Sequence, residues 1–441
     1  MFKDVLVLVL EGIKNDLRRK SLITYYGKVD KIVGLMIESL GPITNIGDVC
    51  RIYAGQSVRI VQAEVVGFRE NRVLLMPYDD IDGIGPGSIV ESTGDKLKVK
   101  VSEELVGRIL DGTGTPIDDK GDVGGSLFYD VTNTPSNPLG RPRIDKRITF
   151  GVKTIDGLLT CGKGQRMGIF SGSGVGKSTL LGMIARNVTA DVNVIALVGE
   201  RGREVRDFIE RDLGDVGMAR SVLLVATSDQ PAMQRLKCAL TATTIAEYFK
   251  DQGKSVLLMM DSLTRYAMAQ REIGLATGEP PVSRGYTPSV YSVMPKLLER
   301  TGNFETGSIT GIYTVLVEGD DVNEPISDTV RGIIDGHIVL SRKIAMRNQY
   351  PAIDVLASVS RLMNEIVDKE QLDLANRLRS VLSIYYSNYD LITIGAYKAG
   401  TNPALDAAIS KIEKVNDFLR QDIYDAFDYS KTIELMKNAL M

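Results

Sequence analysis

The sequence is poor in the residues that most metal and redox chemistry requires. Its 441 residues include one histidine, three cysteines and no tryptophan. Because the histidine, His337, stands alone, catalytic triads that use histidine are excluded and a zinc site is disfavoured. We interpret His337, which lies in an apolar stretch, as structural. The cysteines are scattered without metal-binding or redox spacing, which indicates a reducing cytoplasm.

An excess of charge of one sign and long hydrophobic runs are also missing. The net charge is -3, so the whole chain offers no electrostatic case for binding nucleic acid. No stretch approaches the roughly 20 apolar residues of a membrane-spanning helix. The apolar run at 5–10 is not a signal peptide, because Glu11 interrupts it and basic residues at 18–20 follow where small residues are expected. Apolar positions recur at helical spacing over 1–20, which predicts an amphipathic helix that docks a partner, touches a membrane or packs on its own domain.

Length suggests about three domains, and the residue patterns divide the chain accordingly. After the helix at 1–20, short Val- and Ile-rich runs between Gly and Asp turns predict a small β-barrel domain over 21–92. Dense Gly, Pro and Asp predict a linker over 93–145, with a short helix or strand inside it. Apolar strands alternate with helices, predicted among others over 203–213, 232–250 and 263–273, which indicates an α/β domain with a mostly parallel sheet over 146–361. Residues 362–441 are predicted to form a helical domain, with helices over 362–386, 403–427 and 430–440.

The α/β domain opens on a phosphate-binding pattern. An apolar strand at 167–170 leads into SGSGVGKS at 171–178, and a run of good helix formers follows at 179–186. Glycines allow successive N–H groups to face phosphate oxygens, and the helix N-terminus adds partial positive charge. The pattern predicts that Lys177 reaches the β- and γ-phosphates and that the Ser178 hydroxyl ligates Mg²⁺. The predicted ATP-binding residues of the loop are Gly172, Ser173, Gly174, Val175, Gly176, Lys177, Ser178 and Thr179.

Acidic residues follow two further apolar strands. Asp261 comes directly after 256–260, as in a Walker B strand, where a carboxylate holds Mg²⁺ through water. The alternative is that Asp261 only caps the next helix. Glu200, in GERGREV, is placed to orient and polarise the attacking water, or to cap a helix. Arg201 is a candidate contact to the γ-phosphate, whereas Glu204 is equally explained as a solvent-facing charge near a helix start.

Two more candidates carry weaker patterns. Tyr350 precedes Pro351, which biases it away from helix, so its ring is available to stack on adenine; a core tyrosine is the alternative. Arg361 ends the segment SVSR, far along the chain from the P-loop. It is either a surface charge or an arginine finger that acts on a neighbouring copy, a role worth about 10³–10⁵ in rate.

Taken together, these segments resemble a known family. SGSGVGKS, GERGREV, LLMMDS, YPAIDVLASVSR and GAYKAGTNP are similar to motifs of the secretion ATPases in the rotary ATPase alpha/beta subunit superfamily, above all the flagellar type III export ATPases. The resemblance implies an α/β P-loop (RecA-like) core with an N-terminal β-barrel and a C-terminal helical domain. It assigns P-loop roles to Lys177 and Ser178, the catalytic carboxylate to Glu200, Mg²⁺ to Asp261, adenine stacking to Tyr350 and the finger to Arg361.

The resemblance also implies a function and partners. It implies a homohexamer that hydrolyses ATP with Mg²⁺ to drive or initiate export of unfolded flagellar subunits. The implied partners are a stator-like regulator at the N-terminal helix, a coiled-coil stalk in the pore near the loop at 318–325, a membrane export gate, and export substrates with their chaperones. The implied location is the cytoplasm, at the inner face of the plasma membrane. Ser171 departs from the Gly or Ala usual in the family but keeps a small side chain.

Other functions remain open on sequence alone. A virulence-type secretion ATPase shares the nucleotide site. A catalytic subunit of a rotary ATP synthase needs a second subunit type, whereas here Glu200 and Arg361 lie in one chain. An RNA translocase conflicts with the acidic net charge and with the lack of an aromatic and basic surface near the barrel. A non-hydrolysing scaffold conflicts with the presence of Lys177, Glu200 and Asp261.

We expect ATPase activity per protomer to rise with protein concentration, because a neighbouring copy completes each active site, and single-stranded RNA to leave the rate unchanged. A steady-state assay over a dilution series with Mg²⁺ measures both, with Lys177→Ala as the blank. Activity that appears only with RNA would point to a translocase. No activity at any concentration would indicate that a second type of subunit is missing.

Overall fold

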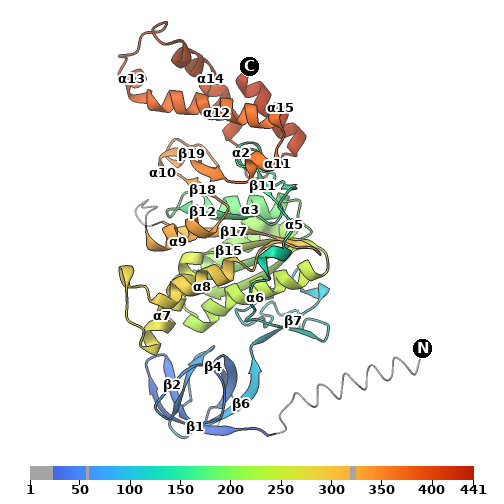
Figure 1. Cartoon of the computed structure of the whole chain (residues 1–441), viewed down its shortest axis with the longest axis vertical. Coiled ribbons are helices and arrows are strands. Elements are labelled where there is room, and N and C mark those ends of the chain that lie inside the picture. Colours follow the sequence, from blue (N-terminus) through green and yellow to red (C-terminus); the bar gives the residue numbers. More distant parts are fainter. Residues whose placement is uncertain (1–22, 56–58, 318–323) are drawn as a thin grey trace, which may run out of the picture. The chain divides into compact units, whose positions relative to one another are not determined.

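The computed structural model describes residues 23–55, 59–317 and 324–441 (Figure 1). The predicted N-terminal helix at 1–20 and most of the predicted pore loop at 318–325 lie outside these residues. The described chain forms two compact units. The first centres on the residues before Val99 and the second on the remainder.

The first unit contains a closed six-stranded barrel, as the sequence predicted. Its strands follow the order β1-β2-β5-β4-β3-β6 around the barrel, and each pair is antiparallel. Alternating side chains such as Ile37, Ile52 and Leu75 fill the interior, and closure leaves no free sheet edge. The strands are β1 (Tyr26–Val33), β2 (Met36–Leu40), β3 (Asp48–Tyr53), β4 (Ile60–Arg69), β5 (Arg72–Pro77) and β6 (Ile89–Lys96).

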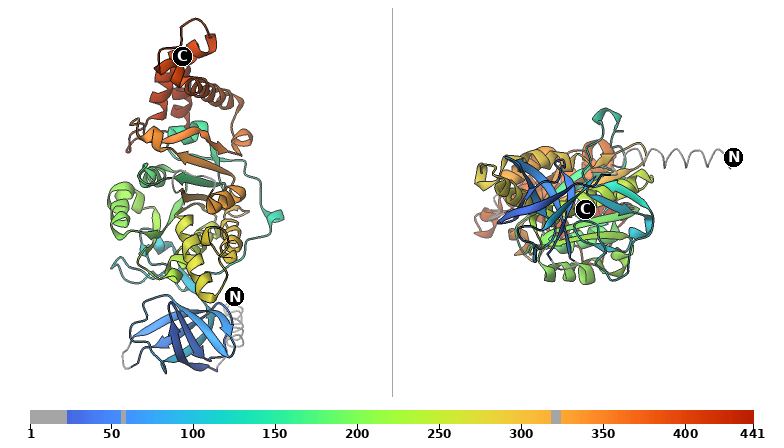
Figure 2. Two further views of the ribbon diagram at one scale, coloured as in Figure 1. Left: turned by 90° about the vertical axis from the view of Figure 1, so that its left-hand side faces the viewer. Right: turned by 90° about the horizontal axis from the view of Figure 1, so that it is seen from below.

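The second unit is built on a nine-stranded sheet in the order β19-β18-β12-β17-β15-β13-β14-β8, with β16 beside β17. Neighbours are parallel except for β19 and β16. The near-continuous buried apolar strands suit a sheet covered on both faces, and Figure 2 shows helices on both sides. The strands are β8 (Ile109–Leu110), β12 (Arg166–Ser171), β13 (Val192–Glu200), β14 (Ser221–Thr227), β15 (Ser255–Asp261), β16 (Gly302–Asn303), β17 (Ser308–Leu316), β18 (Gly336–Leu340) and β19 (Ile353–Ser360).

The segment at 93–145 contains several short elements. β8 extends the edge of the main sheet beside β14, and β7 (Lys98–Val101) pairs with β9 (Leu127–Asp130). Short 3₁₀ helices lie at η1 (Glu103–Leu105) and η2 (Pro138–Gly140). These strands are too short to show a pattern, and their Gly- and Pro-rich surroundings are typical of loops. The domain boundaries stay a prediction.

The helices between the strands follow the predicted spans, with one change of helix type. The predicted helix at 203–213 begins as α4 and continues as a π-helical turn, η3 (Phe208–Leu213). The helices of this region are α2 (Lys153–Leu158), α3 (Lys177–Asn187), α4 (Gly202–Asp207), α5 (Gly214–Met218), α6 (Ala232–Asp251), α7 (Leu263–Thr277), η4 (Ser283–Gly285), α8 (Pro288–Leu298), α9 (Pro325–Ile333) and α10 (Arg342–Ala345). A two-stranded sheet of β10 (Arg147–Ile148) and β11 (Cys161–Gly162) flanks α2.

The C-terminal part is helical, as predicted, but its helices are interrupted. They are α11 (Met363–Ile366), α12 (Lys369–Ser387), α13 (Tyr389–Thr393), α14 (Pro403–Leu419) and α15 (Tyr429–Leu440). The prediction of one helix over 403–427 is wrong after Leu419. There the backbone N–H of Gln421 donates to the Tyr350 carbonyl at 2.9 Å, and its side chain accepts from the Lys153 N–H at 2.9 Å. These hydrogen bonds to the α/β core replace the hydrogen bonds that a continued helix would make. In the parts of the chain that the structure describes, no helix has the length and apolar character to cross a bilayer.

A buried ion pair fastens α6 to the segment after α8. The Arg300 guanidinium donates twice to the Glu247 carboxylate, at 2.8 Å each, and once to the Val131 carbonyl at 3.1 Å. The Arg300 side chain is 1% exposed and that of Glu247 11%. Because both charges are out of water, removal of one partner leaves the other uncompensated.

We therefore expect Arg300→Met to destabilise the fold by about 3–5 kcal/mol. The measurement is the midpoint of thermal unfolding, which should fall clearly. Arg206→Met is the matched control, because its pair with Glu210 is largely exposed and should leave the midpoint unchanged. An unchanged midpoint for Arg300→Met would show that apolar packing replaces the pair.

Candidate functional site

The glycine loop lies between β12 and α3 at the carboxyl edge of the parallel sheet. Gly174 and Gly176 have φ values of +76° and +89°, a region that glycine tolerates at no steric cost. Gly176 is the N-cap of α3, so the first turn of the helix opens directly onto the loop. The unpaired N–H groups of that turn and the helix dipole favour an anion at this point. The loop geometry is therefore that of a phosphate-binding turn.

Three charged side chains from three elements meet at the start of α3. Lys177 opens the helix, Glu200 ends β13 and Asp261 ends β15. The Lys177 ammonium contacts the Asp261 carboxylate directly and lies 3.4 Å from Glu200 Oε1. β13 and β15 are parallel neighbours, with Leu197 opposite Asp261, so both carboxylates emerge at one edge. The structure thus brings together three residues that the sequence singled out separately.

Burial and charge act against each other in this cluster. Burial raises the pKa of Glu200 to about 7, where the Lys177 ammonium opposes the shift and the Asp261 carboxylate adds to it. Burial disfavours the charged form of Lys177, but the two carboxylates outweigh it and hold the pKa of the ammonium above its ordinary value. A charged lysine therefore stands beside a carboxyl group that titrates near neutral pH, the range in which a general base works best.

Thr314, in the middle of β17, fixes the orientation of Asp261. Its hydroxyl donates to Asp261 Oδ1 at 2.6 Å, and both side chains are buried. Sequence reasoning missed Thr314 because a threonine inside an apolar strand is common, and nothing local shows which neighbouring strand it faces.

Arg265, on α7, is a second residue that sequence reasoning missed. Its side chain packs along Gly199, where an added Cβ would lie 3.0 Å from the arginine Cβ. Its buried Nε has no hydrogen-bond partner among the described residues. The only signal for Arg265 in the sequence is its position four residues after Asp261, in the first turn of the helix that follows. A buried guanidinium donor beside Gly199, the residue before Glu200, is a candidate contact for an anionic ligand.

Tyr350 lies against the loop. An added Cβ at Gly176 would meet two carbons of the Tyr350 ring at 3.6 Å, and the residue is 44% exposed. The ring is therefore a surface ring beside the P-loop rather than a core side chain. Ser178 and Thr179 occupy the first turn of α3 and are half-buried.

Arg201 does not join the cluster. The chain turns into α4 at this residue, and its side chain is 77% exposed, with Glu204 at 3.4 Å. Its predicted contact with the γ-phosphate stays a prediction.

Arg361 lies at the other end of the sheet from the P-loop. β18 is parallel to β12 and antiparallel to β19, so β19 ends at the edge where β12 begins. Ser360 pairs with Gly336 at the start of β18, whereas Ser171 pairs with Leu340 at its end. These pairings are four residues apart, about 13 Å of strand. With the loop continuing beyond Ser171, Arg361 is too distant to reach the phosphate site of its own chain.

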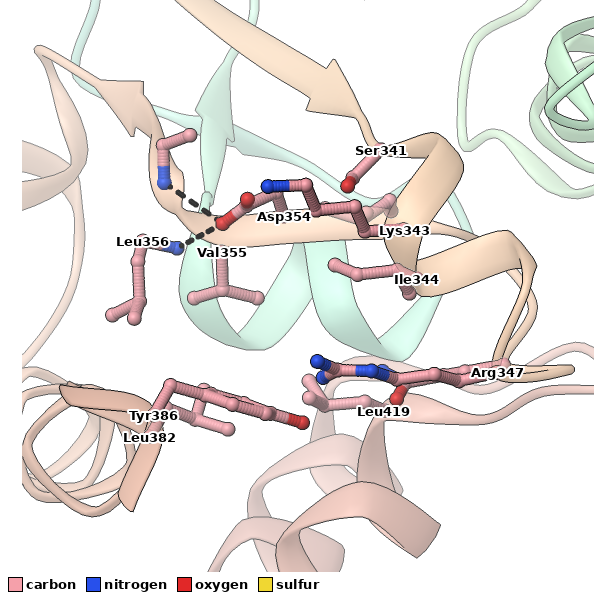
Figure 3. Close-up of a pocket in the computed structure, with 13 residues that line it drawn as sticks. Ser341, Lys343, Ile344, Arg347, Asp354, Val355, Leu356, Leu382, Tyr386 and Leu419 are labelled. Carbon is pink, nitrogen blue, oxygen red and sulfur yellow. Dashed lines mark hydrogen bonds between the residues drawn. The ribbon is translucent and has the colours of Figure 1, made fainter. Parts of the chain in front are cut away.

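A mostly apolar cavity of about 420 Å³ lies near the segment that precedes Tyr350 (Figure 3). β19 and α10 line one side, and Tyr386 of α12 lines the other, with the Arg347 guanidinium stacked 5.0 Å above its ring. The Asp354 carboxylate accepts from the Leu356 and Ala357 N–H groups (Figure 3). The cavity contains none of the glycine loop.

Comparison with known proteins agrees with this geometry. The beta-barrel domain of the ATP synthase alpha/beta family matches residues 29–94, and its nucleotide-binding domain matches 151–360. The C-terminal domain of the T3SS EscN ATPase matches 367–438. The flagellum-specific ATP synthase of Bacillus subtilis is 59% identical over 90% of this chain and 91% of its own. The type 3 secretion system ATPase of Xanthomonas euvesicatoria is 49% identical over 93% of each.

The chain belongs to the family of flagellar and type III secretion ATPases. Among solved structures, the assembled ATPase EscN of enteropathogenic E. coli is 46% identical, with a TM-score of 0.89 over 94% of this chain and all of that one. EscN in complex with its central stalk EscO matches with a TM-score of 0.87. Membership confirms the predicted fold class and a nucleotide-binding ATPase of the export branch, and it favours this function over a rotary-synthase subunit or an RNA translocase.

The raised pKa of Glu200 predicts a pH dependence of this secretion ATPase. Below pH 7 the carboxyl group is protonated and cannot accept a proton from water. We therefore expect kcat/KM for ATP to fall by about tenfold for each pH unit below 7 and to be constant above pH 7. Rate measurements across this range, with nucleotide binding followed in parallel, test the expectation.

Glu210→Gln, at an exposed position, should keep this profile, and Glu200→Gln should lose most of the activity and the profile with it. A flat wild-type profile between about pH 6 and 8 would contradict a base that titrates near neutrality.

Proposed function

We propose that this chain hydrolyses Mg²⁺-ATP as a homohexamer in which Arg361 of each protomer completes the active site of its neighbour. One observation carries the proposal. Lys177, Glu200 and Asp261 converge at one edge of the sheet, while Arg361 emerges at the opposite edge. Each protomer therefore offers a nucleotide site on one side and a finger on the other, and a ring of identical chains closes every site.

In the bound state, Lys177 moves from the two carboxylates to the β- and γ-phosphates, which offer it more negative charge. The hydroxyl of Ser178 and the carboxylate of Asp261 are the residues that would hold Mg²⁺, because both are the oxygen donors that this ion prefers. Mg²⁺ supplies neutralisation of the phosphate charge. Arg265 donates to the γ-phosphate, and Tyr350 stacks on adenine.

Hydrolysis then needs an oriented water and a place for its proton. Glu200 accepts the proton as the water oxygen bonds to the γ-phosphorus and the bond to the β-phosphate oxygen breaks. Arg361 from the neighbouring protomer balances the charge that spreads over the γ-phosphoryl oxygens, a contribution of about 10³–10⁵ in rate for such fingers. ADP and phosphate leave when the interface opens.

The cellular setting follows from the family. We infer that the enzyme works on the cytoplasmic side of the membrane export gate, where it drives or initiates export of unfolded flagellar subunits delivered with chaperones. The structure of EscN with its central stalk EscO supports a coiled-coil stalk in the pore of this ring as well. A stator-like regulator would bind the segment at 1–20. The domain limits at 21–92, 146–361 and 362–441 belong to the same proposal.

Mixing two inactive variants tests the trans arrangement. Lys177→Ala protein lacks a working nucleotide site but keeps its finger, and Arg361→Ala protein has the converse defect. Mixed rings contain interfaces in which an intact site faces an intact finger, so we expect the ATPase rate to recover to a measurable fraction of wild type. Rings shown to contain both variants, for example by two fluorescent labels, yet without recovered activity would sink the proposal.

A further inference from the structure

We propose that Gln371, at the start of α12, is a positioning residue for the finger Arg361. It would act through a buried chain of hydrogen bonds that runs from the C-terminal helices to the backbone of Arg361. This inference rests on the proposed trans role of Arg361.

The chain begins at Gln371, which is completely buried. Its Nε2 donates to the Thr160 hydroxyl at 2.8 Å and to the Asp156 carbonyl at 3.0 Å. Its Oε1 accepts from the Tyr429 hydroxyl of α15 at 2.9 Å. A buried amide with both ends bonded has one favourable geometry, because any shift leaves a polar group unsatisfied. Gln371 therefore locks the start of α12, and α15 with it, onto the turn after α2.

The chain continues from that turn to the finger. The Thr160 carbonyl accepts from the Ser360 hydroxyl at 2.7 Å. Gln165 Nε2 donates both to this hydroxyl and to the Asp335 carbonyl, at 3.1 Å each. The same carbonyl accepts from the backbone N–H of Arg361 at 3.0 Å. Together with the bond from Gln371 to Thr160, five consecutive hydrogen bonds thus connect the start of α12 with the backbone of Arg361.

The finger end of this chain is tightly packed. An added Cβ at Gly336 would lie 2.6 Å from the Val359 carbonyl oxygen and 3.0 Å from Ser360 Cα. The lack of a side chain at Gly336 therefore lets the end of β19 lie close against β18, directly before Arg361. The Arg361 side chain remains exposed and donates to the Arg331 carbonyl at 3.1 Å. The backbone of Arg361 is thus held by hydrogen bonds, while its exposed guanidinium is accessible to a neighbouring protomer.

A second buried glutamine at the same boundary offers a matched control. Gln421 donates to the Gly151 carbonyl at 2.8 Å and accepts from the Lys153 N–H at 2.9 Å. Its backbone N–H donates to Tyr350, so it belongs to the nucleotide side of the protomer, and none of its hydrogen bonds to described residues involves Ser360 or Arg361. Loss of either glutamine loosens the same domain boundary, but only loss of Gln371 should disturb the finger.

The test introduces Gln371→Met, which keeps the side-chain volume, into only one of the two kinds of protomer in the mixed rings at a time. In Lys177→Ala protomers it affects a finger donor, and in Arg361→Ala protomers it affects a nucleotide site. Because a displacement of about 1 Å can cost up to about 10²-fold, we expect recovered kcat to fall about tenfold or more on the donor side, with KM unchanged. Gln371→Met in the Arg361→Ala protomers should change the recovered kcat little. Gln421→Met in the Lys177→Ala protomers should also change it little.

The outcomes separate the two proposals. If reference rings of Lys177→Ala and Arg361→Ala recover no activity, the trans role of Arg361 fails and the inference with it. If they recover and Gln371→Met costs the same on both sides, Gln371 is only structural and the inference is overturned. Should Gln371→Met fail to fold, Tyr429→Phe takes its place, because it removes the hydroxyl that Gln371 accepts from and keeps the ring that Arg147 stacks on at 3.5 Å. A loss confined to the donor side supports the inference in either variant.

Discussion

The contact of one ammonium with two carboxylates is the interaction on which the nucleotide site depends. Lys177, Asp261 and Glu200 come from three elements that the sheet order brings to one edge. Without Lys177, two buried carboxylates would repel each other at this edge, and burial already favours protonation of Glu200. An arriving phosphate group competes for the same ammonium. The arrangement therefore holds the lysine close to the position that the phosphates would occupy. It also keeps both buried carboxylates paired with a positive charge until a nucleotide binds.

The topology of the sheet imposes the second constraint. β12 leads into the phosphate loop, and the antiparallel return of β19 carries Arg361 back to the opposite edge. The glycine loop and Arg361 are therefore separated within every protomer by the length of the strands. If Arg361 acts on a neighbouring copy as proposed, a monomer is catalytically incomplete, and oligomerisation is then part of the catalytic geometry.

The sequence predicted those features that depend on residues close together in the chain. The glycine loop, the apolar strands and the acidic residues at their ends each follow a short pattern, so the loop residues, Glu200 and Asp261 were identifiable. Thr314 acts through a neighbour that is distant in sequence, and no local pattern marks it. For Arg265 the only local signal is its position four residues after Asp261. The helix predicted over 403–427 ends early for the same reason, because Gln421 bonds Tyr350 and also Lys153, which is 268 residues away in the chain.

Buried amides at the domain boundary show why such distant contacts matter for function. An apolar boundary between the core and the C-terminal helices would tolerate sliding, since apolar contacts have no direction. Hydrogen-bonded glutamines allow only certain positions, because each displaced position leaves a buried donor or acceptor unpaired. Gln371 serves the side of the protomer that carries Arg361, and Gln421 serves the side that carries Tyr350. A movement of the C-terminal helices would therefore reach the backbone of both Arg361 and Tyr350, which are the proposed finger and the proposed adenine-stacking residue.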